Sequence, residues 1–206
     1  LFKHVVAIFA ASLSLLSCGG DVESARLASD SRASEKVAQT LYNSAVAAEN
    51  AGKLGRAIKI YEKIVLRHPL CPAASESAFR WGKLLEKDDE LLEAFEAYDA
   101  ILVKYPASPH YAEAMQRQEI IATQAAEGQI NNSFIGFKIR VSLKKSAEML
   151  AKVRQNAPRA ISAEKAQYTI GRIYQSRGNQ TNEAALAINA FRELTRDFPD
   201  SQYAPD

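Results

Sequence analysis

Apolar side chains recur at helical spacing in three segments of the chain that align with one another. Each segment opens with alanine, has an aromatic residue four positions later and an aliphatic residue three positions after that, and ends at a proline. The three segments are residues 57–69, 94–106 and 187–199. Residues 146–158 form a weaker copy, with Leu150 and Val153 in the aromatic and aliphatic places. The spacing predicts one amphipathic helix in each copy, ended by its proline.

A second helical pattern precedes every copy, so the repeating unit is predicted to be a helical hairpin. The four first helices are expected at residues 37–51, 75–86, 111–126 and 163–176. Ala45, Gly82 and Gly171 lie at corresponding points in three of them, where a larger side chain would hold the two helices apart. The fold is therefore predicted to be all-α, a solenoid of about four stacked hairpins over residues 34–206.

The beginning of the chain has the pattern of an export signal. Lys3 is followed by a run of apolar residues, 5–16, that only two serines interrupt. This run is shorter than the roughly 20 residues that a membrane-spanning helix needs. It ends in Leu-Leu-Ser-Cys at residues 15–18, which resembles the lipobox of bacterial lipoproteins. The alternative is an ordinary secretory signal with a chance cysteine.

The lipobox resemblance implies a lipoprotein signal peptide at residues 1–17 and diacylglycerol on the sulfur of Cys18. Residues 18–33, small and polar, would then be the lipidated tether. Aspartate directly after the lipidated cysteine is a retention signal for the inner membrane, and this chain has Gly19 there. We therefore expect a lipid-anchored protein on the outer membrane that faces the periplasm. With Cys18 lipidated, Cys71 has no partner for a disulfide, so the core alone must hold the fold.

The repeat resembles the tetratricopeptide repeat, which has a period of about 34 residues, a small residue in the first helix, alanine opening the second, and a late proline. Here the first two copies are 37 residues apart, and the extra residues follow the proline, as in Pro69-Leu70-Cys71-Pro72. With the lipobox, this longer turn is similar to that of the BamD family, outer-membrane lipoproteins of the β-barrel assembly machinery. The resemblance covers residues 34–206. It implies a scaffold that binds the barrel insertase, its associated lipoproteins and unfolded barrel clients.

Two features depart from a regular array. The third unit carries about fifteen additional residues, 128–142, because its prolines are 52 rather than 37 residues apart. Phe134 and Phe137 in this insertion are candidates for contact with a partner; in the alternative interpretation they fold back on the solenoid. The chain also stops at Asp206, where another first helix is expected, so a truncated C-terminus is the prediction.

Composition and charge exclude most other classes of protein. The 26 basic and 24 acidic side chains nearly balance, which argues against a nucleic-acid partner. Two cysteines and three histidines are too scattered for a metal site. His68 and Cys71 could pair as base and thiol, but His68 holds the helix-end place that Tyr105 and Phe198 hold in other copies. Without a phosphate loop, paired-carboxylate cleft or nucleophile elbow in the sequence, we expect no enzyme activity and no cofactor.

Binding is therefore the expected function, and the first helices provide the surface, because they line the concave face of such a solenoid. Aromatic residues lie three positions before the small residue and cations one position after it, at Tyr42, Phe79, Lys83, Tyr168 and Arg172. Gln116 and Ile120 are assigned to these places in the third unit. Aromatics beside cations can hold apolar side chains and carboxylates, including a peptide C-terminus. Alternatively, the aromatics only pack against the next repeat.

Two other functions stay open at this point. A YbgF-type adaptor of cell division or peptidoglycan would carry a trimerising coiled coil ahead of the repeats, and residues 19–40 are short and polar for one. An anchoring module of a longer envelope enzyme, or of its regulator, would need a catalytic domain after Asp206. The sequence favours the scaffold for outer-membrane protein assembly.

Overall fold

The computed structural model describes residues 19–134, 137–177 and 181–204. The helices within these ranges are α1 (Gly19–Asn50), α2 (Leu54–Arg67), α3 (Ala73–Lys87), α4 (Leu91–Lys104), α5 (Tyr111–Ala126), α6 (Leu143–Asn156), α7 (Ile161–Ser176) and α8 (Thr181–Asp197). Two short strands, β1 (Asn131–Phe134) and β2 (Phe137–Arg140), lie between α5 and α6. The predicted helices are confirmed. All of the second helices end just before the prolines that predicted their ends.

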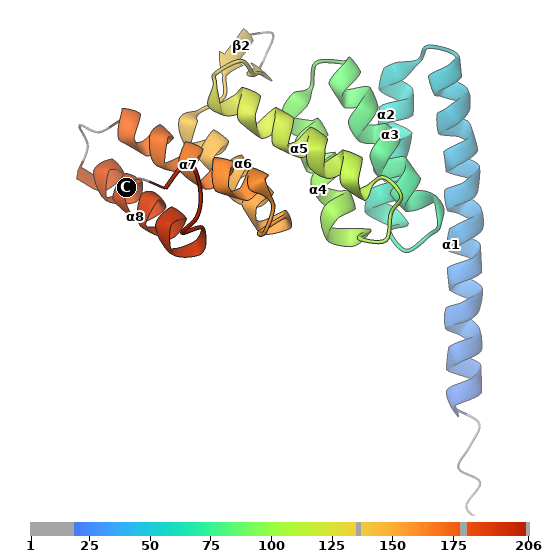
Figure 1. The fold of residues 1–206 in the computed structure, drawn as a ribbon. Helices are drawn as coiled ribbons and strands as arrows, with labels where there is room; N and C mark the ends of the chain where they lie inside the picture. Colours follow the sequence, from blue (N-terminus) through green and yellow to red (C-terminus); the bar gives the residue numbers. More distant parts are fainter. Residues whose placement is uncertain (1–18, 135–136, 178–180, 205–206) are drawn as a thin grey trace, which may run out of the picture.

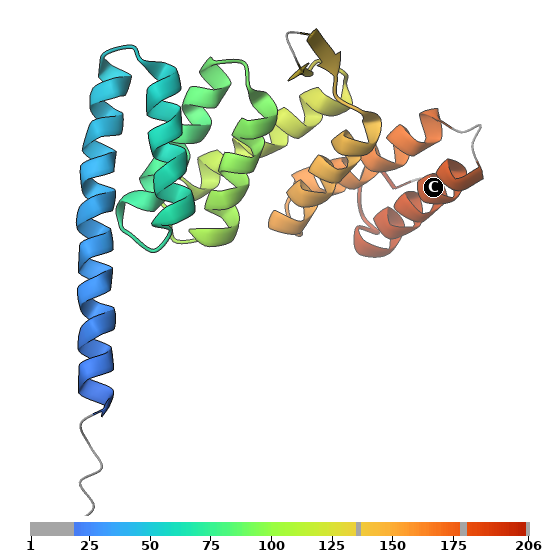
Figure 2. The same ribbon diagram turned by 180° about the vertical axis from the view of Figure 1, so that it is seen from behind.

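The helices form four hairpins, α1/α2, α3/α4, α5/α6 and α7/α8, and each helix packs on the next one in sequence. Figure 1 shows the hairpins side by side in one row that runs from α1 to α8. Figure 2 shows the opposite face, with α2, α4 and α6 toward the viewer. The predicted all-α solenoid of hairpins is confirmed. Within the described ranges, strands occur only in the insertion of the third unit.

In the second and fourth hairpins, the aromatic residue of the second helix fills the space beside the glycine of the first helix. Tyr98 is fully buried there, and Tyr61 at the matching place in the first hairpin is fully buried as well. A Cβ atom on Gly82 would lie 2.8 Å from the ring of Tyr98, and one on Gly171 would lie 2.6 Å from the ring of Phe191. These distances are too short for a side chain, which confirms that the glycines mark close helix crossings.

Replacing Gly82 with leucine is expected to destabilise the fold by about 1–3 kcal/mol, because the new side chain would have to displace the Tyr98 ring. For a domain of this size, the melting temperature should fall by roughly 2–12 °C. The matched control is Lys59→Leu, which places the same side chain on an exposed position of α2. Equal melting temperatures for the two variants would contradict the stacked-hairpin packing.

The segment predicted as a tether is helical. Residues 19–33 form the first part of α1 and extend beyond the body of the solenoid (Figure 1). The cause is visible in the sequence, since no glycine or proline occurs between Asp21 and Asn50 to end the helix. Ser34 is where the helix meets the body, because its Oγ is hydrogen-bonded to His68 Nδ1 at 2.8 Å. At 1.5 Å per residue, the projecting part is about 22 Å long.

Candidate partner-binding surfaces

On the face formed by α1, α3, α5 and α7, here termed the inner face, three aromatic residues at matching places in units one, two and four each pair with an aromatic residue of the second helix. The ring centroids of Tyr42 and Tyr61 are 6.0 Å apart, those of Phe79 and Tyr98 are 6.4 Å apart, and those of Tyr168 and Phe191 are 6.1 Å apart. All three pairs are tilted by 56–58°. Tilted rings at this separation attract one another. The aromatic residues predicted for binding therefore also stabilise the packing of the two helices in their own hairpins.

Two of these aromatics also stack on a residue of the following segment. The Phe79 ring is parallel to that of His110, with centroids 4.0 Å apart. The Tyr168 ring stacks on Tyr203, with centroids 5.1 Å apart. Phe79, Tyr42 and Tyr168 keep part of their surface exposed. The structure thus shows the packing contacts that the alternative interpretation expects, and it leaves edges of the same rings open to a partner.

A cation lies over each of the three aromatics. Arg80 is 6.0 Å from the ring centroid of Tyr42, Lys83 is 6.0 Å from that of Phe79, and Arg172 is 5.8 Å from that of Tyr168. Such contacts hold the charge over the negative face of the ring. The predicted pairing of aromatic and basic residues on one face is present in the second and fourth units, and α3 adds Arg80 to the first.

These cations differ in how their charge is balanced. Lys83 pairs with Glu113 at 3.3 Å. Arg80 pairs with Glu76 at 2.7 Å and with Glu49 at 3.3 Å. Arg172 donates a hydrogen bond to the Tyr168 hydroxyl at 3.0 Å and pairs with no carboxylate in the described part of the chain. The exposed guanidinium of Arg172 is therefore the cation best placed to receive a carboxylate from a partner.

In the third unit, the positions predicted for the inner-face residues are wrong by three residues. Gln116 and Ile120 were assigned to the aromatic and cationic places, but both are exposed, and neither flanks the crossing. The buried set in α5, Ala114, Gln118 and Ala122, matches the buried set Ala163, Gln167 and Gly171 in α7. Ala122 is thus the crossing residue. The inner face has Glu119 and Thr123 in this unit, and no aromatic–cation pair.

The insertion of the third unit is a β-hairpin that stands out beside the end of α5 (Figure 1). Phe134 and Phe137 face each other in the antiparallel register at its tip, and their side chains lie outside what the structure describes. The base is anchored, because Ile130 and Val141 are only 2% and 6% exposed and the Val141 N–H donates to the Ile130 carbonyl at 3.1 Å. The flanks fold back on the solenoid while the strands project from it.

A repeated clasp, which was not predicted from the sequence, joins the first three units. It consists of a glutamate near the end of one first helix, the tyrosine of the second helix and an arginine of the next first helix. The two copies, 37 residues apart, are Glu49, Tyr61 and Arg80, and Glu86, Tyr98 and Arg117. In the first copy the Tyr61 hydroxyl donates to Glu49 at 2.8 Å. In the second copy Tyr98 and Arg117 both donate to Glu86.

The pKa of both clasp tyrosines is raised, mainly by burial. Burial, followed by the hydrogen bond to Glu49, raises the pKa of the Tyr61 phenol. Burial likewise raises the pKa of Tyr98. A phenol is already protonated at physiological pH, and the raised pKa extends its role as a donor to more alkaline solution. The clasp could have been predicted from the sequence, because its glutamate, tyrosine and arginine recur with the same period as the prolines.

His68 and Cys71 do not form a catalytic pair with any further acid in the described chain. His68 is bonded to Ser34, whose Oγ is also 3.8 Å from Cys71 Sγ. This contact ties α1 to the turn between α2 and α3. No group of three or more potential metal ligands occurs among the described residues. Cys18, the predicted lipidation site, lies outside them.

Comparison with known proteins places the chain in a family. The YfiO family model, described as outer membrane lipoprotein, matches residues 34–206, so the chain belongs to this family. No curated protein matches it. Two crystal structures of TPR-like repeats from a Podosopora anserina kinesin light chain homologue are similar at 16% and 17% identity, each over 80% of this chain and 77% of that one, with TM-scores of 0.35 and 0.36.

The family description makes the general class clear. The chain is a helical-repeat member of an outer-membrane lipoprotein family, and stacked hairpins of this kind are typically surfaces for protein interaction. Among the helices that the structure describes, none is long and apolar enough to span a membrane.

Proposed function

We propose that this protein is a non-catalytic, lipid-anchored scaffold for the assembly of outer-membrane β-barrel proteins. Three features support the proposal: the family match over residues 34–206, the lipobox that ends at Cys18, and the aromatic–cation pairs of the inner face. The partners would be the barrel insertase, its associated lipoproteins and the C-terminal segments of unfolded barrel clients. The lipid on Cys18 would hold the protein on the periplasmic side of the outer membrane.

The observation that carries the binding role is the arrangement at the inner face of α7. Arg172 lies over Tyr168, and Tyr203 stacks on the same ring. A peptide carboxylate can accept hydrogen bonds from the guanidinium while its apolar side chains lie against the two tyrosines. In the second unit, Lys83 and Phe79 offer the same chemistry, but Glu113 shares the charge of Lys83.

The projecting part of α1 suits this role. About 22 Å of helix lies between Gly19 and the point at which Ser34 contacts the body. A lipid on Cys18 would therefore place the solenoid at a distance from the bilayer surface. Partners with domains close to the membrane could then reach the inner face.

Affinity capture of the full-length lipoprotein from detergent-solubilised outer membranes tests the proposal. We expect the barrel insertase and its lipoproteins to be recovered in amounts comparable to the bait. Recovery of division or peptidoglycan-binding proteins in their place would support the adaptor alternative and contradict the assembly role.

A further inference from the structure

Neighbouring second helices are bridged by polar side chains at fixed places of the repeat. Between α4 and α6, the donors on α6 are Lys145, Lys152 and Asn156. Lys145 Nζ lies 3.6 Å from Glu96. Lys152 Nζ lies 2.8 Å from Glu96 and 2.9 Å from Asp99, and Asn156 Nδ2 donates to Asp99 at 3.0 Å. These three places of a second helix therefore face the second helix that precedes it.

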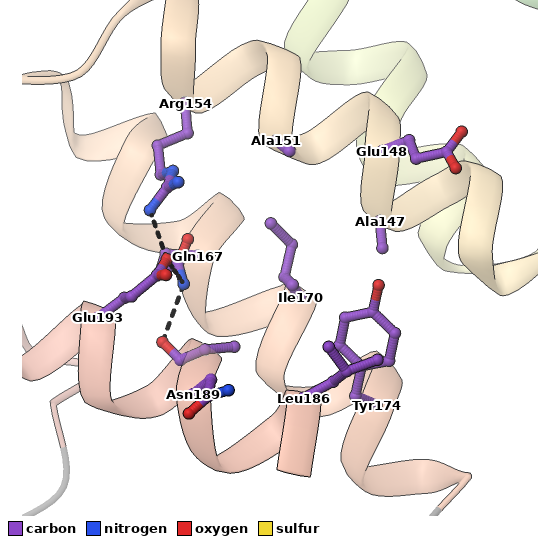
Figure 3. Close-up of a pocket in the computed structure, with 11 residues that line it drawn as sticks. Ala147, Glu148, Ala151, Arg154, Gln167, Ile170, Tyr174, Leu186, Asn189 and Glu193 are labelled. Atoms are coloured by element: carbon purple, nitrogen blue, oxygen red, sulfur yellow. Dashed lines mark hydrogen bonds and ion pairs between the residues drawn. The ribbon is translucent and has the colours of Figure 1, made fainter. Parts of the chain in front are cut away.

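The junction between α6 and α8 uses the same places. Counted from the opening residue of each second helix, Glu193 matches Lys152, and Asp197 matches Asn156. Figure 3 shows the ion pair between Arg154 of α6 and Glu193 of α8, with a nitrogen–oxygen distance of 2.9 Å. Arg154 also lies 3.9 Å from Asp197. Two junctions thus show these places turned toward the preceding second helix.

In α2 the three matching places are held by cations, in chain order Arg56, Lys63 and Arg67. All three are exposed, and they form no ion pair with the described residues. Within the described chain no second helix precedes α2, which begins the row of second helices (Figure 2). α2 has four basic residues and one acidic residue. Its outer side therefore presents positive charge that no neighbouring helix balances.

The first helix of the same unit also presents an uncovered apolar position. Val37 is 48% exposed. The same place in the other first helices is fully buried, at Ala74, Ala114 and Ala163. Ala74 shows the cause of this burial, because it belongs to one core cluster with Tyr61 and Ile64 of α2, the preceding second helix. Val37 is exposed because α1 has no such helix against it.

A shallow groove of about 430 Å³ runs along this side of α1, lined by Ala33, Lys36, Val37, Thr40 and Leu41. By the matching of places, the groove on α1 and the three cations on α2 border the position that a preceding second helix would take. We term this position the end site. α4 takes the corresponding position in the middle of the solenoid, because it packs on α5 and its carboxylates meet the donors of α6.

The charges at the end site distinguish between possible occupants. In α4, Glu96 and Asp99 meet the donors of the next second helix. A second copy of the chain stacked by its α8 would bring Asn189 and Arg192 to these two places. Arg192 would then lie against cations, which is unfavourable. The end site therefore suits a helix of another protein that carries carboxylates there.

We propose that the end site binds an amphipathic helix of a partner protein, in the place of a second helix ahead of α2. Its apolar side covers Val37 and Leu41, and two carboxylates three or four residues apart meet Lys63 and Arg67. The charges fix its direction and exclude basic helices. The end site is separate from the inner face, so this inference goes beyond the proposed function and does not depend on it.

The binding test uses the intact lipoprotein in detergent micelles, with its valine and leucine methyl groups labelled for nuclear magnetic resonance. The probe is an acetylated and amidated peptide with the sequence of α4. The matched control peptide carries Glu96→Lys and Asp99→Lys. We expect saturable shifts of the Val37 and Leu41 methyl signals with the probe, at a Kd of roughly 0.1–1 mM. The control peptide should bind at least about tenfold more weakly, because it sets like charges against each other.

Exchanging the charges makes this test specific. The protein variant Lys63→Glu with Arg67→Glu should lose the probe and bind the control peptide in its place. Lys59→Glu, which removes an exposed cation from the same helix at the place of Glu96, should change neither affinity. All these positions are exposed, and melting temperatures check the fold. Absence of methyl shifts at millimolar probe, equal affinity for both peptides, or shifts confined to α5 and α6 would overturn the inference.

Photocrosslinking in cells identifies the occupant. A photoreactive benzoylphenylalanine in place of the exposed Thr40 should form an adduct with a partner helix that has two carboxylates three or four residues apart. The adduct should disappear in the Lys63→Glu, Arg67→Glu variant. Adducts only between two copies of this chain, no protein adduct, or an adduct that survives the charge change would overturn the partner helix. If the adduct forms while no assembly protein is captured from membranes, the proposed function fails and the end site stands.

Discussion

Replacing Cys18 with serine is expected to move the protein almost completely from the membrane fraction to the soluble fraction. The thioether to diacylglycerol needs the cysteine sulfur, and serine offers no equivalent nucleophile to the lipidation reaction. Each buried methylene of an acyl chain contributes about 0.8 kcal/mol, so two or three chains hold a protein on a bilayer effectively permanently, whereas one chain does so only marginally. Fractionation followed by immunoblotting measures the change.

The matched control for that variant is Cys71→Ser, which removes the other cysteine of the chain. Cys71 lies half-buried in the turn between α2 and α3, so its replacement should leave the protein on the membrane. Intact-mass analysis of the membrane-extracted wild type gives an independent reading. An unmodified thiol on Cys18 would refute the lipid anchor.

Replacing Phe79 and Arg172 together with alanine is expected to weaken partner capture at least roughly thirtyfold. Truncation of a binding hot spot commonly costs about 2 kcal/mol or more, and 1.4 kcal/mol corresponds to a factor of ten in Kd. The change removes apolar contact area in the second unit and the exposed guanidinium of Arg172 in the fourth. Quantitative capture of the purified insertase by immobilised lipoprotein measures the loss.

Two controls keep this experiment interpretable. Because Phe79 stacks on His110 and packs against Tyr98, its loss also lowers stability, so the melting temperature and the helix content are measured beside capture. Arg172 is exposed, so the single variant Arg172→Ala should fold as the wild type does.

Replacing residues 131–140 with an Asn-Gly turn removes the β-hairpin and keeps the buried Ile130 and Val141. If this variant loses capture while the double variant keeps it, the hairpin is the binding element.

The helices were predictable because their signals are local. The periodic apolar residues, the alanine that opens each second helix and the proline that follows it all act within one hairpin. Gly82 and Gly171 were predictable for the same reason, since a glycine within a regular helical pattern points to a close contact. The structure then identifies Tyr98 and Phe191 as the rings that need this space.

The features that the sequence did not reveal depend on how one unit sits against the next. The crossing residue Ala122 lies 18 residues after the end of α4, whereas Gly82 lies 15 residues after the end of α2, so Gln116 and Ile120 were placed wrongly. A fixed repeat length cannot detect such a shift, whereas the buried set of Gln118 and Ala122 does.

The conformation of the insertion also escaped prediction. Residues 128–142 were expected as an excursion, and the structure forms a two-stranded hairpin with Asn131 opposite Arg140. The buried Ile130 and Val141 lie directly before and after the strands and fix their register. Only the packed core shows that these two residues are anchors, because along the chain they are two apolar residues among several.

Partners are predicted to bind on the inner face, and photocrosslinking in cells can detect that contact. Lys165 is exposed and lies one helical turn before Tyr168 on the same side of α7. A photoreactive benzoylphenylalanine at position 165 should form an adduct with an outer-membrane assembly protein on irradiation. The same residue at position 59, exposed on α2, should form none. Adducts from position 59 with none from position 165 would contradict binding on the inner face.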